Sequence, residues 1–183
     1  MPKFHPLKIR EVRPETEECV SIAFEVPEAL QPEYAFLPGQ YLTLRAEING
    51  EEVRRSYSIC STPAEGLRVA VKKVPEGRFS TYANETLKAG DELEVMTPMG
   101  RFTAEPDQAK AKHYVAFAAG SGITPVMSIM KTVLEQEPMS TFTLFYGNRM
   151  VDSIIFREEI EGLKNEHMGR LRIYHVLSRE KLG

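Results

Sequence analysis

The chain has 183 residues, of which 42% are hydrophobic, and its formal net charge is -3. This length and composition suit one or two globular domains. Because phosphate binding requires clustered lysine and arginine, the slightly acidic balance argues against nucleic acid as the main partner. The two cysteines, Cys19 and Cys60, lack the spacing of metal ligands, so the sequence predicts no metal site and assigns any iron–sulfur (2Fe–2S) centre to a missing domain or a partner.

The longest apolar runs, such as residues 114–119, are far shorter than the roughly 20 residues that a membrane-spanning helix needs. The N-terminus also lacks the pattern of a cleavable signal peptide. We therefore expect a cytoplasmic protein without a membrane partner.

Up to about residue 105, the chain is a series of short β-type runs separated by glycine, proline and asparagine. Examples are residues 20–26, 41–44 and 67–72. Their alternation and this punctuation predict antiparallel strands that close into a small barrel. One short helix is expected at about residues 80–87. We assign residues 1–105 to this first domain.

A second domain is predicted to follow a polar linker at residues 104–112. Residues 114–119 form a continuous apolar run, which is typical of a buried parallel strand. The expected elements that follow are helices at residues 124–135 and 153–163 and strands at residues 142–146 and 171–177. This βαβαβ order predicts one half of a doubly wound, parallel α/β sheet at residues 112–183.

Residues 54–63 read Arg-Arg-Ser-Tyr-Ser-Ile-Cys-Ser-Thr-Pro. In a strand, Arg55 and Tyr57 point to the same face. A flavin is a flat ring on a phosphorylated chain, so its site needs an aromatic or aliphatic wall, a cation and a hydrogen-bond partner near N5. The cation, aromatic ring and hydroxyls of this stretch are the residue types that such a site needs. The alternative is an exposed edge strand in which arginine and tyrosine are ordinary cross-strand partners.

Three further motifs accompany this strand: residues 36–41 (Phe-Leu-Pro-Gly-Gln-Tyr), 77–81 (Gly-Arg-Phe-Ser-Thr) and 97–102 (Thr-Pro-Met-Gly-Arg-Phe). In order and spacing, the set resembles the flavin-binding module of the ferredoxin–NADP reductase superfamily. The resemblance implies a six-stranded, antiparallel Greek-key barrel that binds FAD.

The resemblance also assigns roles to individual residues. Arg55 would pair with the FAD pyrophosphate, while Tyr57 would pack on the isoalloxazine and Ser58 would lie near flavin N5, which makes Ser58 and Tyr57 the candidate catalytic residues. The remaining FAD-binding candidates are Ser56, Val71, Lys72, Gly77, Phe79 and Ser80. Val71 and Lys72 would contribute mainly backbone contacts, and the last three would cradle the pyrophosphate at a helix start.

Residues 118–125 (Ala-Ala-Gly-Ser-Gly-Ile-Thr-Pro) follow a predicted strand and open a predicted helix, where free backbone N–H groups can meet a pyrophosphate. Thr124 suits the N-cap and Pro125 the first helical position. A tight strand-to-helix turn without a ligand is the alternative, because Pro125 replaces the third glycine of the dinucleotide fingerprint. The segment resembles the nicotinamide-binding loop of the same superfamily, which makes Gly120, Gly122 and Thr124 candidate contacts.

Arg149 follows the second strand of this domain, and Ser178 and Arg179 follow the third, at strand ends where open α/β sheets bind ligands. In the superfamily, a Ser-Arg pair at this place often holds the 2′-phosphate of NADPH. The resemblance therefore favours NADPH, with NADH also possible. The alternative for both arginines is solvated loop charge.

The resemblance implies an FAD-dependent oxidoreductase that passes electrons from NAD(P)H to an iron–sulfur domain or ferredoxin and an oxygenase component. The motifs look closest to reductase components of multicomponent oxygenases. Because the superfamily's nicotinamide domain continues with further strands, we expect a C-terminally truncated member, impaired in NADPH handling, that self-associates through the open edge of residues 114–119. Two alternatives are a non-catalytic electron-relay flavoprotein and a cofactor-free interaction module.

Overall fold

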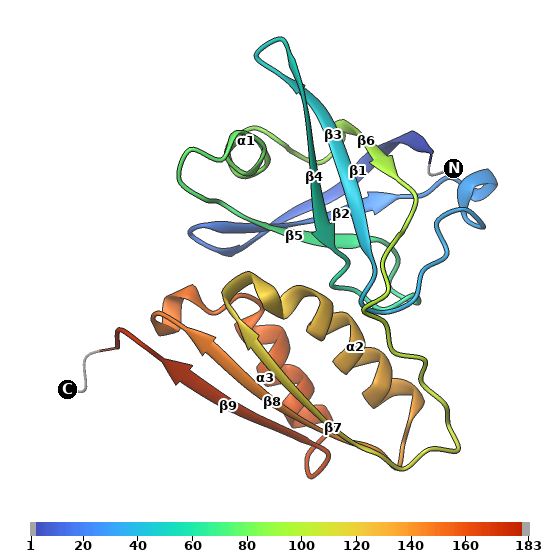
Figure 1. The fold of residues 1–183 in the computed structure, drawn as a ribbon, viewed down its shortest axis with the longest axis vertical. Helices are drawn as coiled ribbons and strands as arrows, with labels where there is room; N and C mark the ends of the chain where they lie inside the picture. Colours follow the sequence, from blue (N-terminus) through green and yellow to red (C-terminus); the bar gives the residue numbers. More distant parts are fainter. Residues whose placement is uncertain (1–2, 181–183) are drawn as a thin grey trace.

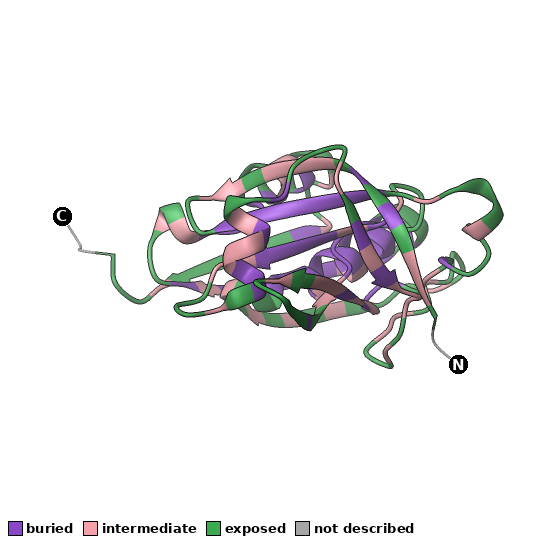
Figure 2. Cartoon of the chain, turned by 90° about the horizontal axis from the view of Figure 1, so that it is seen from above, coloured by how far each residue is buried: buried purple, intermediate pink, exposed green. Residues whose placement is uncertain are grey.

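A computed structural model describes residues 3–180 as an N-terminal barrel beside an α/β unit (Figure 1). Figure 2 shows buried segments along strands and helices and exposed segments at the turns between them. Within the described residues, no helix has the length and apolar character needed to cross a membrane.

The barrel is a six-stranded antiparallel sheet. Its strands are β1 (Phe4–Thr16), β2 (Cys19–Glu25), β3 (Tyr41–Ile48), β4 (Glu51–Ser58), β5 (Arg68–Lys72) and β6 (Glu92–Met96), in the order β4-β3-β6-β1-β2-β5. An isolated bridge between Ile59 and Val69 links the end of β4 to β5, across the two edges of the sheet. The expected flavin-binding type of barrel is confirmed in its strand number and antiparallel pairing.

Alternating side chains of the strands fill the barrel, because successive residues of a strand point to opposite faces. The short helix α1 (Arg78–Glu85) adds Phe79 and Ala83 to this core, and both are almost fully buried. The helix begins two residues earlier than the sequence predicted, with Gly77 at the N-cap. A single turn of 3-10 helix, η1 (Glu28–Leu30), lies between β2 and β3.

The second unit is a parallel sheet in the order β7-β8-β9. Its elements are β7 (His113–Ala119), η2 (Gly120–Gly122), α2 (Ile123–Gln136), β8 (Thr141–Asn148), η3 (Val151–Ser153), α3 (Arg157–Glu166) and β9 (Leu171–Leu177). The predicted βαβαβ order is therefore confirmed. The predicted start of its second helix at residue 153 is wrong: residues 151–153 form a separate 3-10 turn, and Phe156 adopts a left-handed conformation (φ 62°) before α3 begins.

The expectation that residues 114–119 form a strand buried on both faces is also wrong. Tyr114, Ala116 and Ala118 pack against the core that contains α2 and α3, whereas Phe117 is 77% exposed. Both helices share one core on the same face of the sheet, and no helix among the described residues covers the opposite face. We call this the open face, and define it as the side chains of Val115, Phe117, Phe145, Tyr174 and Val176.

Two turns in the barrel require glycine, but for different reasons. Gly39 has a φ of +97° in the turn that the Gln40 N–H closes onto the Leu37 carbonyl, and a Cβ there would overlap the carbonyl oxygen of Phe102. Gly50 has a φ of +76° in the hairpin between β3 and β4, where a Cβ would meet nothing. A side chain at Gly39 therefore adds a steric clash to the conformational cost.

We predict that Gly39→Ala lowers the free energy of unfolding by more than about 2 kcal/mol, because the turn and the segment at Phe102 must separate. The matched control Gly50→Ala carries only the left-handed penalty of about 1 kcal/mol. Urea titration of both variants measures the difference. Equal destabilisation would contradict the close packing at Gly39.

Candidate functional site

A cleft of about 420 Å³ lies where the barrel meets the start of α2. Most of its lining consists of predicted FAD or nicotinamide contacts, namely Arg55, Ser56, Tyr57, Ser58, Lys72, Gly77, Phe79, Ser80, Gly122 and Thr124. Ala70, Val74, Ser121 and Pro125 complete the lining, although the sequence did not single them out as contacts. The structure thus brings together residues from β4, β5, α1 and α2.

Tyr57 and Phe79 provide the aromatic part of the cleft. Their ring centroids are 5.7 Å apart, with the rings tilted by 37°. Burial raises the pKa of Tyr57 to about 12, against the opposing effect of the Arg55 charge. The phenol is therefore neutral at physiological pH and can act as a packing surface or hydrogen-bond donor, not as a base.

Arg55 is exposed and its guanidinium donates to the backbone carbonyl of Arg54 (Nη1···O 2.7 Å). Within residues 3–180, it forms no ion pair, whereas its neighbour Arg54 is paired with Glu52 (2.6 Å). Ser56 shares a hydrogen bond with Thr43 (3.0 Å), and Ser58 is half-buried at the end of β4. Arg55 is therefore the member of the arginine pair whose charge is available to an anion.

The N-terminus of α1 offers backbone N–H groups to the same cleft. Gly77 is the N-cap and has no side chain to satisfy them, and no side-chain cap is formed. A Cβ at Gly77 would overlap the hydroxyl of Ser80, which accepts from the Val74 N–H (3.2 Å) and donates to the Gly77 carbonyl (3.0 Å). The first-turn N–H groups and the helix dipole therefore favour an anion at this end.

The loop before α2 approaches the cleft from the other side. Its glycines are open, because a Cβ at Gly120 or Gly122 would meet nothing within 4 Å. Gly122, not Thr124, is the N-cap, so the predicted capping role of Thr124 is wrong; its hydroxyl donates to the Ser121 carbonyl (3.0 Å). The buried Tyr146 hydroxyl donates to the Gly120 carbonyl (3.0 Å) and thereby holds the loop.

A second cleft of about 370 Å³ lies at the carboxyl ends of β7, β8 and β9. It contains three predicted contacts, Gly120, Arg149 and Ser178, and shares Lys72 with the first cleft. It also contains Asn148, which the sequence reasoning missed; its amide nitrogen is buried without a hydrogen-bond partner in the described part of the chain. A polar residue at the end of a buried parallel strand was the available signal.

Two predicted contacts lie outside the linings of both clefts. The Val71 side chain is fully buried in the barrel core, and its carbonyl accepts from the Asn84 amide (3.0 Å). Arg179 is exposed, and its backbone N–H donates to the Arg149 carbonyl (2.9 Å), which connects the ends of β8 and β9. The side chains of Val71 and Arg179 therefore line neither cleft.

Charge distinguishes these clefts from a larger cavity of about 890 Å³ elsewhere on the chain. That cavity is lined by five cations and five carboxylates, several of them paired with one another. Among the described residues, the 420 Å³ cleft has the cations Arg55 and Lys72 and no carboxylate. An anionic ligand is therefore favoured at the smaller cleft.

The comparisons with known proteins agree with this chemistry. A family described as "Oxidoreductase FAD-binding domain" matches residues 6–104, and one described as "Oxidoreductase NAD-binding domain" matches residues 117–183. The chain belongs to the FAD- and NAD-binding oxidoreductases of the ferredoxin–NADP reductase type. The recognition from sequence motifs and the expected classes of cofactor are thereby confirmed.

Among individual relatives, the chain is 47% identical to one of the subunits of 1,2-phenylacetyl-CoA epoxidase from Escherichia coli K12, over the whole chain and 51% of that protein. It is 37% identical to the ferredoxin reductase component of 3-ketosteroid-9-alpha-monooxygenase from Rhodococcus rhodochrous, over 93% of the chain and 48% of that protein. The chain spans about half the length of these curated relatives. The similarity to oxygenase reductase components expected from the motifs is confirmed.

The fold is also that of a ferredoxin–NADP reductase from Neisseria gonorrhoeae solved with bound FAD and NADP. The two structures agree with a TM-score of 0.80 at 23% identity, over 99% of this chain and 71% of the other. The residues at the 420 Å³ cleft fit FAD, because an aromatic wall, a free arginine and an uncapped helix start match its ring and its diphosphate.

We predict that Arg55→Ala weakens FAD binding roughly tenfold to hundredfold, which is the usual size of a lost charge-assisted hydrogen bond. The matched control is Arg54→Ala, which removes the adjacent arginine that pairs with Glu52. Fluorescence titration of the apoprotein with FAD measures both affinities. A larger loss in the control than in Arg55→Ala would contradict the assignment.

Proposed function

We propose that this chain is the FAD-binding and part of the nicotinamide-binding machinery of an NAD(P)H oxidoreductase that delivers electrons to an iron–sulfur domain or ferredoxin. The observation that supports this proposal most is that two clefts meet at Lys72, one beside the flavin motif and one beside the nicotinamide loop, and that no carboxylate from residues 3–180 lines either of them. We assign residues 1–105 to the flavin domain and 112–183 to the nicotinamide domain.

Bound FAD would supply the redox chemistry, accepting a hydride from NAD(P)H and releasing electrons singly. The protein's residues hold and orient it. Arg55 and the backbone around Gly77, Phe79 and Ser80 bind the diphosphate, supported by the open charge of Arg55 and the uncapped start of α1. Tyr57 would pack on the ring, and the Ser58 hydroxyl would donate a hydrogen bond to it, because both residues line this cleft together with Lys72.

The nicotinamide nucleotide would occupy the second cleft. Gly120 in this cleft and Gly122 in the first would let its diphosphate approach the backbone of the loop before α2. Thr124 lines the first cleft, and Lys72 lines both. Arg149 and Ser178, with Arg179 following, favour the 2′-phosphate of NADPH because they place cationic and hydroxyl groups at the strand ends.

The proposed role is that of the reductase component of a multicomponent oxygenase. The relatives named as epoxidase and monooxygenase components support this role, and the 47% relative favours an oxygenase of phenylacetyl-CoA in phenylacetate degradation. The iron–sulfur centre and the oxygenase would be contributed outside residues 1–183. The cytoplasmic location expected from the sequence stays a prediction.

We predict that the purified chain, incubated with FAD and freed of excess, shows flavin absorbance in the visible range, and that titration with NADP⁺ perturbs this spectrum. A colourless protein would contradict the proposed function.

The same titration distinguishes the proposed reductase from the two alternatives, an electron-relay flavoprotein and a cofactor-free interaction module. Flavin absorbance with no response to NADP⁺ or NADPH would favour the electron-relay flavoprotein. Rapid NADPH-driven reduction of a cytochrome by this chain alone would contradict the expected impairment. Failure to bind FAD, in a protein that folds normally by circular dichroism, would favour the cofactor-free interaction module.

We further propose that the chain associates with a second copy through the edge of β7, together with the open face beside it. Phe117, Phe145 and Tyr174 stack in a row across the three strands, with successive ring centroids 5.0 Å apart. Flanking Val115 and Val176 are 52% and 59% exposed. A flat apolar surface next to the edge strand β7 suits self-association, because burial removes it from water.

We predict that Phe117→Ser shifts the protein toward monomer in multi-angle light scattering at high protein concentration. The control is Met168→Ser, which removes a side chain that is similarly exposed (81%, compared with 77% for Phe117) but lies outside the open face. A wild-type protein that is monomeric at every concentration would contradict the proposed self-association.

A further inference from the structure

Helix α2 carries four buried polar side chains; the Thr132 hydroxyl bonds within the helix to the Ser128 carbonyl, and the other three matter here. Thr124, Ser128 and Lys131 are 6%, 0% and 5% exposed, and their spacing of four and three residues brings them to the same face. Apolar residues such as Met127 and Met130 belong to the core beneath the sheet. A buried polar group is costly unless it is partnered, so the partners of these three side chains matter to the position of the helix.

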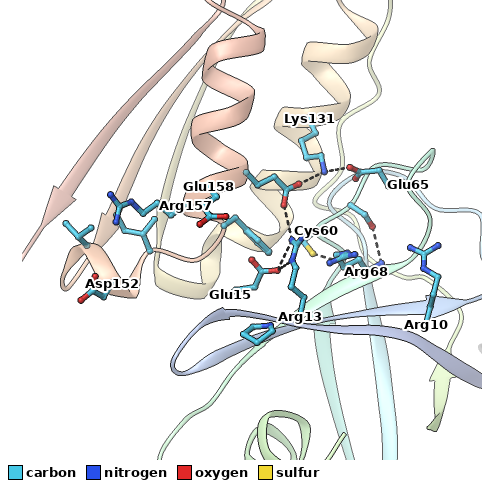
Figure 3. Close-up of a pocket in the computed structure, with 16 residues that line it drawn as sticks. Arg10, Arg13, Glu15, Cys60, Glu65, Arg68, Lys131, Asp152, Arg157 and Glu158 are labelled. Carbon is cyan, nitrogen blue, oxygen red and sulfur yellow. Dashed lines mark hydrogen bonds and ion pairs between the residues drawn. The ribbon is translucent and has the colours of Figure 1, made fainter. Parts of the chain in front are cut away.

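The partners tie α2 to the barrel. The Ser128 hydroxyl donates to the buried Ser61 carbonyl (2.7 Å). The Lys131 ammonium is paired with Glu65, in the barrel loop between β4 and β5, and with Glu159 of α3 (2.6 Å). Figure 3 shows Lys131 and Glu65 pointing toward each other across this seam.

The chain of ion pairs also reaches strand β1 of the barrel. The other oxygen of the Glu159 carboxylate accepts from Arg13 of β1 (3.4 Å), and Arg13 is also paired with Glu15 (2.8 Å). Burial lowers the pKa of Lys131, but its two carboxylate partners outweigh this effect and raise the pKa overall. The ammonium therefore stays charged, and opposite charges alternate from Glu65 to Arg13.

These links lie where packing is sparse. Arg13, Ser61, Glu65, Lys131 and Glu159 all line the 890 Å³ cavity, so this side of the seam is not filled by apolar side chains. Because a cavity provides few van der Waals contacts, the polar links add to the apolar contacts that α2 makes with Cys19, Cys60 and Ala70 of the barrel.

The same links connect the two halves of the cofactor site. Ser61 follows Ser58 of the flavin strand by three residues, and Ser128 follows Thr124 of the nicotinamide loop by four. Lys131 is two helical turns beyond Thr124, roughly 10 Å along the axis. A slide of α2 along its axis would break the Ser128 and Lys131 links together and move the loop away from the flavin strand.

We propose that Ser128 and Lys131 are positioning residues, which set the nicotinamide loop at Gly120–Gly122 against the flavin strand at Ser58. This inference rests on the proposed function, because it concerns the alignment of NADPH with FAD. It assigns no contact with either cofactor to Lys131. Hydride transfer depends steeply on alignment, and a misplacement of about 1 Å can reduce a rate about a hundredfold.

The test compares Lys131→Met with Lys131→Arg, which keeps the charge, in the FAD-loaded chain. For Lys131→Met, we expect FAD affinity within about twofold of wild type, since the FAD contacts are in the barrel. The NADP⁺-induced change in the visible circular dichroism of the flavin should shrink, and anaerobic flavin reduction by NADPH should slow at least tenfold at saturating NADPH. Lys131→Arg should restore both readouts, and the exposed-residue control Lys164→Met should leave them unchanged.

Wild-type dichroism and reduction rate in Lys131→Met would overturn the proposal. If Lys131→Met fails to fold, the variant Glu65→Gln tests the proposal instead. It removes the exposed carboxylate partner of Lys131 and leaves Lys131 paired with Glu159. A several-fold slower reduction with unchanged FAD affinity in Glu65→Gln supports the positioning role, and a wild-type rate overturns it. A wild-type chain that binds no FAD or ignores NADPH instead contradicts the proposed function itself.

Discussion

Helix α2 packs both against its own α/β unit and against the barrel, and the geometry of the site depends on these two sets of contacts. Its apolar residues share a core with β8, α3 and the barrel residues Cys19, Cys60 and Ala70. Its buried polar residues bond to the barrel through Ser61 and Glu65. Because the start of α2 forms one wall of the 420 Å³ cleft and β4 forms another, the contact between helix and barrel determines how far apart the two cofactor-binding halves are.

The side chains and backbone groups that line the 420 Å³ cleft indicate which ligand it binds. The cleft combines an arginine that has no ion-pair partner among residues 3–180, a neutral aromatic wall and a helix start with glycine at its N-cap and no side-chain cap in this part of the chain. Each feature alone occurs in proteins without a cofactor. Together they match the cation, ring and anion requirements of a phosphorylated flavin. The larger cavity lacks this match, because it mixes charges of both signs and several of them are paired with one another.

The sequence predicted the fold class and most of the site because both depend on local patterns. Strand alternation and turn residues indicated the barrel, and two short segments, residues 55–58 and the start of α1 at Gly77, Phe79 and Ser80, line the cleft. The bare face of β7 was not predicted, since an apolar run looks the same whether one face or two is covered. The fully buried side chain of Val71 likewise depends on which face of β5 points inward.

These local patterns could not predict contacts between segments that are distant in the sequence. Lys131 and Glu65 are separated by 66 residues, and Arg13 and Glu159 by 146. Nothing in the sequence around Lys131 distinguishes it from a solvated lysine on a helix. Asn148 was missed for a related reason, because its lack of a hydrogen-bond partner emerges only when the ends of β8 and β9 are brought together.

A crystal structure of the chain grown with FAD is the most direct measurement. The proposed site requires the flavin ring against Tyr57, with the diphosphate between Arg55 and the first turn of α1. Electron density for the diphosphate in the 890 Å³ cavity, or a cleft at Tyr57 that excludes the ring, would contradict it.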